Sequence, residues 1–143
     1  MAALALAVAA AVSFVWVWRR PGRFAAMVGA VLSLLAAMAM VPAVLYFIAP
    51  HAYETPRHLC PFCLLHADVG GIGWPLFASV FAGTALGVGM GVVAWQRGTG
   101  VRGPAREVLR GLGRTGAVLW LSGALLAAFP VARYWWLTGT GLF

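Results

Sequence analysis

The side chains that can do chemistry gather in one short segment of this 143-residue chain, His58-Leu59-Cys60-Pro61-Phe62-Cys63-Leu64-Leu65-His66. The segment holds both cysteines and two of the three histidines, in a chain that is otherwise mostly apolar. Two cysteines separated by two residues can form a redox-active dithiol, supply two thiolates to a metal ion, or close a structural disulfide. These three interpretations lead to three different functions.

In the redox interpretation, Cys60 attacks a partner's disulfide and Cys63 resolves the mixed disulfide. Pro61 is typical of a first helical turn, so the sequence after Cys60 predicts a short helix with Cys60 at its N-cap. The positive end of a helix stabilises a thiolate, which is the attacking species in disulfide exchange. Arg57 and His58 add positive charge just upstream. We therefore predict Cys60 and Cys63 as catalytic residues that exchange disulfides with a partner protein.

The metal interpretation takes His58, Cys60, Cys63 and His66 as ligands. Thiolate sulfur and imidazole nitrogen are suitable ligands for both Zn²⁺ and Cu(I). Four ligands within so short a segment are crowded for a closed tetrahedral zinc site, so a Cu(I) site with two or three ligands fits the spacing better. The function would then be metal binding or delivery.

The third interpretation is structural, with the chain an accessory subunit of a larger membrane complex. Its cysteines would either remain reduced or form a disulfide that pins the loop. A disulfide across so short a loop gains little chain entropy, which disfavours a purely stabilising purpose.

The composition predicts a membrane protein. Hydrophobic residues make up 63% of the chain and charged residues only 9%, whereas soluble domains carry about 25% charged residues. Apolar stretches long enough for spanning helices cover residues 2–18, 24–48, 74–95 and 115–137. No basic residue precedes the first stretch, which argues against a cleaved signal peptide. We expect an all-α, polytopic four-helix transmembrane bundle, with residues 1–143 forming a single domain.

The distribution of arginine predicts the orientation of the bundle. Most arginines lie between the first and second stretches or between the third and fourth, which the positive-inside rule assigns to the cytoplasm. The loop 96–114 is then cytoplasmic, while the cysteine-bearing loop 50–73 and both termini face outward. In a bacterium this is the inner membrane, with the cysteines in the oxidising periplasm.

The cytoplasmic loop has a helical pattern of its own. Arg102, Arg106, Arg110 and Arg114 recur at every fourth position. The pattern predicts an amphipathic helix on the inner leaflet, whose arginines meet anionic lipid. Membrane anchoring explains this charge without a nucleic-acid partner.

Small residues and prolines predict how the spans pack. Gly83, Gly87 and Gly91 form a stripe that lets another helix approach closely, and a contact within the chain is favoured over a dimer. Pro42 and Pro130 predict bends near the cysteine loop, which either open a shallow cavity beneath it or are tolerated kinks. The predicted spans contain no His, Asp, Glu or Lys, which argues against a buried proton relay.

A Cys-Pro-Phe-Cys motif at the outer end of four membrane helices resembles the DsbB and vitamin K epoxide reductase families. The resemblance covers Cys60 to Cys63 and the number of helices. It implies that electrons pass between a periplasmic thioredoxin-like partner and a quinone cofactor. The chain differs from these families in having one cysteine pair instead of two, and in its predicted outward termini.

Overall fold

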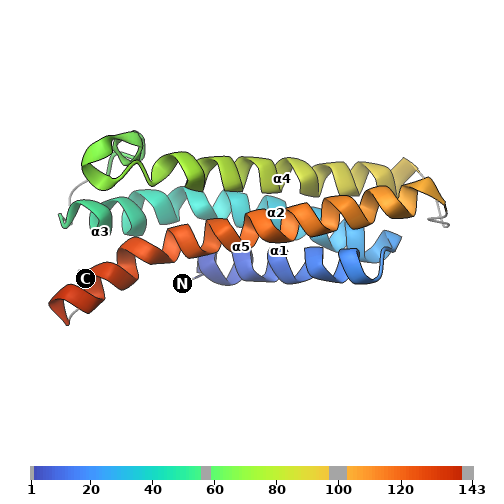
Figure 1. Cartoon of the computed structure of the whole chain (residues 1–143), viewed down its shortest axis with the longest axis horizontal. Helices are drawn as coiled ribbons and strands as arrows, with labels where there is room; N and C mark the ends of the chain where they lie inside the picture. The colour runs from blue at the N-terminus through green and yellow to red at the C-terminus, as the bar shows by residue number, and fades with distance from the viewer. Residues whose placement is uncertain (1, 56–58, 97–102, 140–143) are drawn as a thin grey trace.

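The computed structural model describes residues 2–55, 59–96 and 103–139, and these residues form helices and turns without strands (Figure 1). The α-helices are α1 (Ala2–Arg19), α2 (Arg23–Ala43), α3 (Ala49–Tyr53), α4 (Gly73–Gln96) and α5 (Pro104–Thr138). A π-helical turn, η1 (Val44–Ile48), joins α2 to α3, and two short 3₁₀ turns, η2 (Phe62–Leu65) and η3 (Ala67–Val69), precede α4.

Among the described residues, four helical runs are long and apolar enough to cross a membrane: Ala2–Arg19, Arg23–Tyr53, Gly73–Gln96 and Pro104–Thr138. The predicted all-α fold with four candidate spans is therefore confirmed, and the chain has the character of a multi-pass membrane protein. The first and third spans begin and end within one residue of the predicted limits, whereas the second and fourth are longer than predicted.

The fourth span differs most from the prediction, because residues 104–114 are the first turns of α5 and not part of a loop. Residues 104–114 are helical, as the arginine spacing predicted, but in the described part of the chain they continue into α5 and do not form a separate amphipathic helix. Arg102, the first arginine of that pattern, lies outside the described residues. The first turns of α5 are held by packing: Leu109 is fully buried, and Gly113 lies against the backbone of α1. Contact with α1 thus extends the helix well beyond the apolar stretch.

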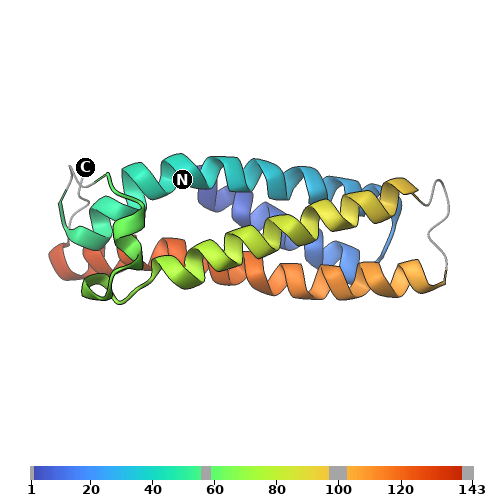
Figure 2. The same ribbon diagram turned by 90° about the horizontal axis from the view of Figure 1, so that it is seen from above.

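The four long helices form a ring in which α1 and α4 each pack against both α2 and α5 (Figures 1 and 2). The cysteine segment, α3 and the C-terminal end of α5 lie at one end of the bundle. The α1–α2 connection and the start of α5 lie at the other end. Along the bundle axis, α1 begins farther from the cysteine end than α3 does. The second helical run and α5 therefore extend past the start of α1 toward the cysteine end.

The glycine stripe of α4 makes contacts within the chain, but with two different helices. A Cβ atom on Gly87 would overlap the Ser33 side chain of α2, and one on Gly91 would lie 3.0 Å from the Ala30 Cβ of the same helix. A Cβ on Gly83 would instead lie 3.0 Å from Nε1 of Trp120 in α5. The stripe therefore lets α4 fit closely between α2 and α5, as expected for small residues at membrane helix contacts.

A second pair of glycines, which the sequence did not single out, joins α1 to α5. A Cβ on Gly116 would overlap the ring of Phe14, which is fully buried. A Cβ on Gly113 would lie 2.7 Å from the backbone nitrogen of Trp18. The contact between α1 and α5 therefore requires glycine, which has no Cβ atom, at both positions.

Pro42 and Pro130 are accommodated without interrupting the helical runs that contain them. Pro42 lies in the last turn of α2 and is followed directly by the π turn η1, while α5 continues through Pro130. A proline removes one helical hydrogen bond, and a π turn accommodates the extra residue of a locally widened helix. The widened turn of the second span faces the Pro130 region of α5 across the cavity described below.

Candidate functional site

The cysteine segment is a pair of tight turns and not the single short helix predicted from the sequence. Pro61 precedes η2, so Cys60 lies one residue before the N-cap that we assigned to it. His66 then has an extended backbone, with ψ at 154°, which separates η2 from η3. A four-residue 3₁₀ turn has little dipole, so the helix-terminus argument for a stabilised Cys60 thiolate does not hold. The thiolate depends instead on specific hydrogen bonds.

Two neighbouring helices hold the cysteine turn in place. On one side, the Tyr53 hydroxyl at the end of α3 donates a hydrogen bond of 2.8 Å to the Cys63 carbonyl. On the other side, the fully buried Leu64 packs against the start of α4, where a Cβ on Gly73 would lie 2.8 Å from the Leu64 carbonyl carbon. The position of the two thiols is therefore set by contacts on both sides of the turn.

The two thiols are reduced, half-buried and unequal in acidity. A hydrogen bond from the Cys63 side chain lowers the pKa of Cys60, and the backbone N–H groups of Cys63 and Phe62 lower it further. The same side-chain hydrogen bond raises the pKa of Cys63, with burial, the neighbouring Cys60 and the Asp68 carboxylate acting in the same direction. Cys60 is therefore the better nucleophile of the pair at neutral pH, because the thiolate is the attacking species.

Of the residues assigned to a metal site, the structure brings Cys60 and Cys63 together, but no third described ligand completes a group with them. His66 is exposed at the turn between η2 and η3. Within residues 2–55, 59–96 and 103–139, no group of three or more His, Cys, Asp or Glu side chains could hold a metal ion. His58, the remaining predicted ligand, and Arg57 lie outside the described residues. A site with three or four ligands would therefore need a residue outside the described chain, whereas a two-thiolate Cu(I) site at Cys60 and Cys63 stays a prediction.

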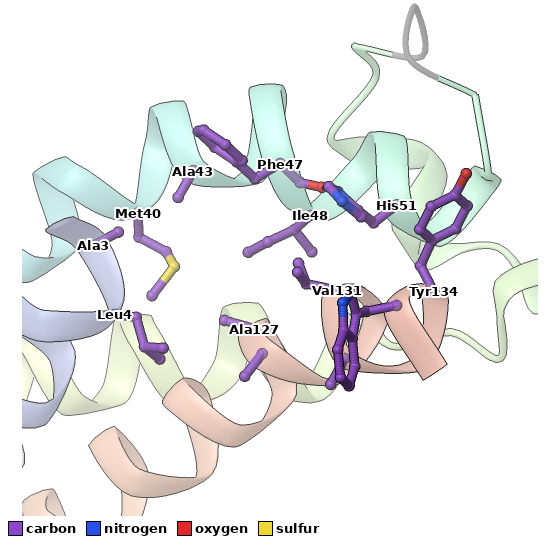
Figure 3. A pocket seen from close by; sticks show the side chains of 13 residues that line it. Ala3, Leu4, Met40, Ala43, Phe47, Ile48, His51, Ala127, Val131 and Tyr134 are labelled. Atoms are coloured by element: carbon purple, nitrogen blue, oxygen red, sulfur yellow. The ribbon is translucent and has the colours of Figure 1, made fainter. Parts of the chain in front are cut away.

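A cavity of about 470 Å³ lies between α2–η1–α3 and the outer half of α5, next to the first turn of α1 (Figure 3). It lies between the segments that contain Pro42 and Pro130, for which the sequence left open either a shallow cavity or two tolerated kinks. Its lining is mostly apolar and consists of Ala3, Leu4, Met40, Ala43, Phe47, Ile48, His51, Ala127, Ala128, Val131, Ala132, Tyr134 and Trp135. The short helix α3 joins this cavity to the cysteine turn, because His51 lines the cavity and Tyr53 holds the turn.

His51 is a buried residue of the second span that the sequence analysis placed in the outer loop. Its side chain is only 6% exposed, and its Nδ1–H donates a 2.6 Å hydrogen bond to the Phe47 carbonyl. The imidazole also packs edge-on against the Tyr134 ring, with the ring centroids 5.4 Å apart. The second helical run therefore continues past the predicted limit at residue 48 and includes a histidine. The sequence feature that could have indicated this extension is the continuous apolar run up to Pro50. Proline is tolerated in the first turn of a helical segment, so Pro50 need not end the helical run.

Comparison of the chain with models of protein families, with curated proteins and with solved structures found no match. The resemblance to the DsbB and vitamin K epoxide reductase families therefore rests on the Cys-Pro-Phe-Cys motif and the four helices alone. The argument for function starts from the cysteine turn itself.

Proposed function

We propose that this chain is a multi-pass protein of the bacterial inner membrane whose Cys60–Cys63 pair exchanges disulfides with a periplasmic thioredoxin-like partner. The observation that carries the proposal is the placement of the two free thiols side by side, on a turn that Tyr53 holds from one side and Leu64 from the other. The hydrogen bond between the two side chains lowers the pKa of Cys60 and raises that of Cys63. A disulfide exchange catalyst needs this asymmetry, because one thiol must attack as a thiolate while the other waits as a thiol.

The sidedness of the proposal follows from the positions of the arginines. Six arginines of the described chain are exposed near the α1–α2 connection or in the first turns of α5, at the end opposite the cysteine turn: Arg19, Arg20, Arg23, Arg106, Arg110 and Arg114. The positive-inside rule assigns that end to the cytoplasm. The cysteine turn and both termini then face the periplasm, where disulfides persist.

The exchange proceeds in two balanced steps. The Cys60 thiolate attacks one sulfur of the partner's disulfide, which forms a mixed disulfide and releases the partner's other sulfur as a thiolate. Cys63 then loses its proton to that thiolate or to solvent and attacks the Cys60 sulfur, which releases the partner's second thiolate. Two electrons pass to the partner, and Cys60 and Cys63 become a disulfide. The reverse sequence oxidises the partner, and the relative reduction potentials decide the direction.

Thiol labelling in intact cells tests this assignment. A membrane-impermeant maleimide should modify Cys60 in wild-type protein after mild reduction, and should react less before reduction if the pair cycles through a disulfide. The matched control is Cys60→Ser, which leaves only the less acidic Cys63. Absence of Cys60 labelling in intact cells, together with full labelling after the membrane is permeabilised, would place the pair on the wrong side for this function.

A further inference from the structure

The cavity between α2–η1–α3 and α5 has an apolar body and a polar end. Leu4, Met40 and Ala127 line the part farther from the cysteine turn, whereas His51 and Tyr134 lie at the end nearest that turn (Figure 3). The described residues that line the cavity include no Asp, Glu, Lys or Arg. The cavity therefore has the polarity of an amphiphile, with an apolar length and a polar terminus.

The mouth of the cavity lies on the lipid-facing side of the bundle. Phe47 and Trp135 belong to its lining, yet their side chains are 50% and 61% exposed. Both residues lie in helical runs that are long and apolar enough to cross a membrane, so the medium around the mouth is lipid or the membrane interface. Ala3 and Leu4 in the first turn of α1 line the cavity. Figure 2 shows that α2 and α5 continue toward the cysteine end of the bundle beyond the start of α1.

The volume and chemistry of the cavity limit what can occupy it. A volume of about 470 Å³ lies within the range of roughly 300–1,000 Å³ that is typical of small-molecule sites. Water is a poor occupant, because an ordered water needs two to four polar partners and most of this lining offers none. An empty cavity would forfeit dispersion contacts along its whole wall. A hydrocarbon chain from the adjacent bilayer can enter without losing hydration.

We propose that the cavity binds a hydrocarbon chain of a membrane amphiphile, with the polar end of the amphiphile toward His51. Tyr134 and Trp135 support this orientation, since such amphipathic rings collect at the level where lipid headgroups begin. The chain belongs either to a phospholipid, as an acyl chain, or to a polyprenyl compound. Both sources present the same flexible apolar segment to Met40 and Ala127.

Photolabelling with two probes tests the proposal on the full-length protein in lipid nanodiscs. One probe is a phosphatidylcholine with a diazirine near the middle of one acyl chain, and the other is a diazirine-bearing polyprenol. The matched positions are two methionines of α2: Met38 is 72% exposed to the surrounding medium, whereas Met40 is 4% exposed and lines the cavity. Ordinary boundary lipid should label Met38 alone, whereas a chain inside the cavity should label Met40 as well.

Label at Met40 from either probe supports the proposal, and the more efficient probe identifies the source of the chain. Label at Met38 without label at Met40, in both arms, overturns it. That result is also expected if a helix of a second copy or another protein segment fills the cavity.

Filling the cavity provides the second arm of the test. Ala127→Phe places a ring in the space that the chain would occupy, and Ala43→Leu fills it from the opposite wall. Either variant that retains the helical circular dichroism of the wild type should lose label at Met40 and keep label at Met38. Undiminished label at Met40 in a folded, filled variant would contradict the proposal. Replacing Cys60 and Cys63 with serine should change neither signal, so this proposal can fail or stand independently of disulfide exchange.

Discussion

Gly113→Ala is expected to destabilise the bundle by forcing α1 and α5 apart. The added Cβ would lie 2.7 Å from the Trp18 backbone nitrogen and 2.9 Å from the Phe14 carbonyl oxygen, whereas ordinary contact begins at 3.4 Å. Neither neighbour can rotate away, because both are backbone atoms. The helices must therefore separate, and overpacking of this kind costs about 1–3 kcal/mol.

The matched control is Gly111→Ala, in the same helix. A Cβ there has nothing within 4 Å, so this variant should gain only the helix propensity of alanine over glycine, ~1 kcal/mol. The difference between the two variants isolates the α1–α5 contact, because both gain the same propensity. Reversible unfolding in mixed detergent micelles, followed by far-ultraviolet circular dichroism, measures each free energy of unfolding. Equal free energies for the two variants would refute the packing argument.

Three further outcomes follow from the same structure. The alkylation rate of Cys60 should rise with pH around a midpoint below the ordinary thiol pKa of about 8.5. Cys63→Ala should move that midpoint upward, because it removes the side-chain hydrogen bond that lowers the pKa of Cys60. An unchanged midpoint would count against the thiol–thiol hydrogen bond. Tyr53→Phe removes the hydrogen bond to the Cys63 carbonyl. Such a bond is worth about 1 kcal/mol, so amide hydrogen exchange in η2 should accelerate by about fivefold. Exchange at the wild-type rate would show that the hydroxyl does not hold the turn. Gly87→Ala should weaken the α2–α4 contact, while Gly89→Ala, with open space around its Cβ, should not; equal unfolding curves for the two would argue against that contact.

The number and type of the long helices were predictable from the sequence, because spanning a membrane demands long apolar runs. The ends of the second and fourth spans were not. The four-residue spacing of the arginines predicted a helix over residues 104–114, but its continuity with the fourth span is seen only in the structure, where Leu109 is buried and Gly113 contacts α1. Such contacts depend on which helices become neighbours, which hydrophobicity alone does not specify.

The candidate site was predictable in its residue types but not in its geometry. The spacing of Cys60 and Cys63 pointed to the dithiol, yet the expected helix dipole is absent and hydrogen bonds take its place. His51 and Tyr53 escaped notice, because Pro50 looked like the start of a loop and the π turn before it cannot be identified from composition. The connection of the cavity to the cysteine turn through His51 and Tyr53 of α3 depends on how the helices pack, so it could not be predicted from the sequence.

The most direct test of disulfide exchange is the capture of a mixed disulfide in living bacterial cells that express the protein. Cys63→Ser removes the resolving thiol, so the partner should remain attached to Cys60 and run as a larger, reductant-sensitive species on a non-reducing gel. Cys60→Ser should trap much less, because Cys63 has the raised pKa. Mass spectrometry of the trapped species should find a periplasmic protein joined through Cys60. Trapping by neither variant, or equally by both, would contradict the assignment of Cys60 as the attacking cysteine of a disulfide exchange protein.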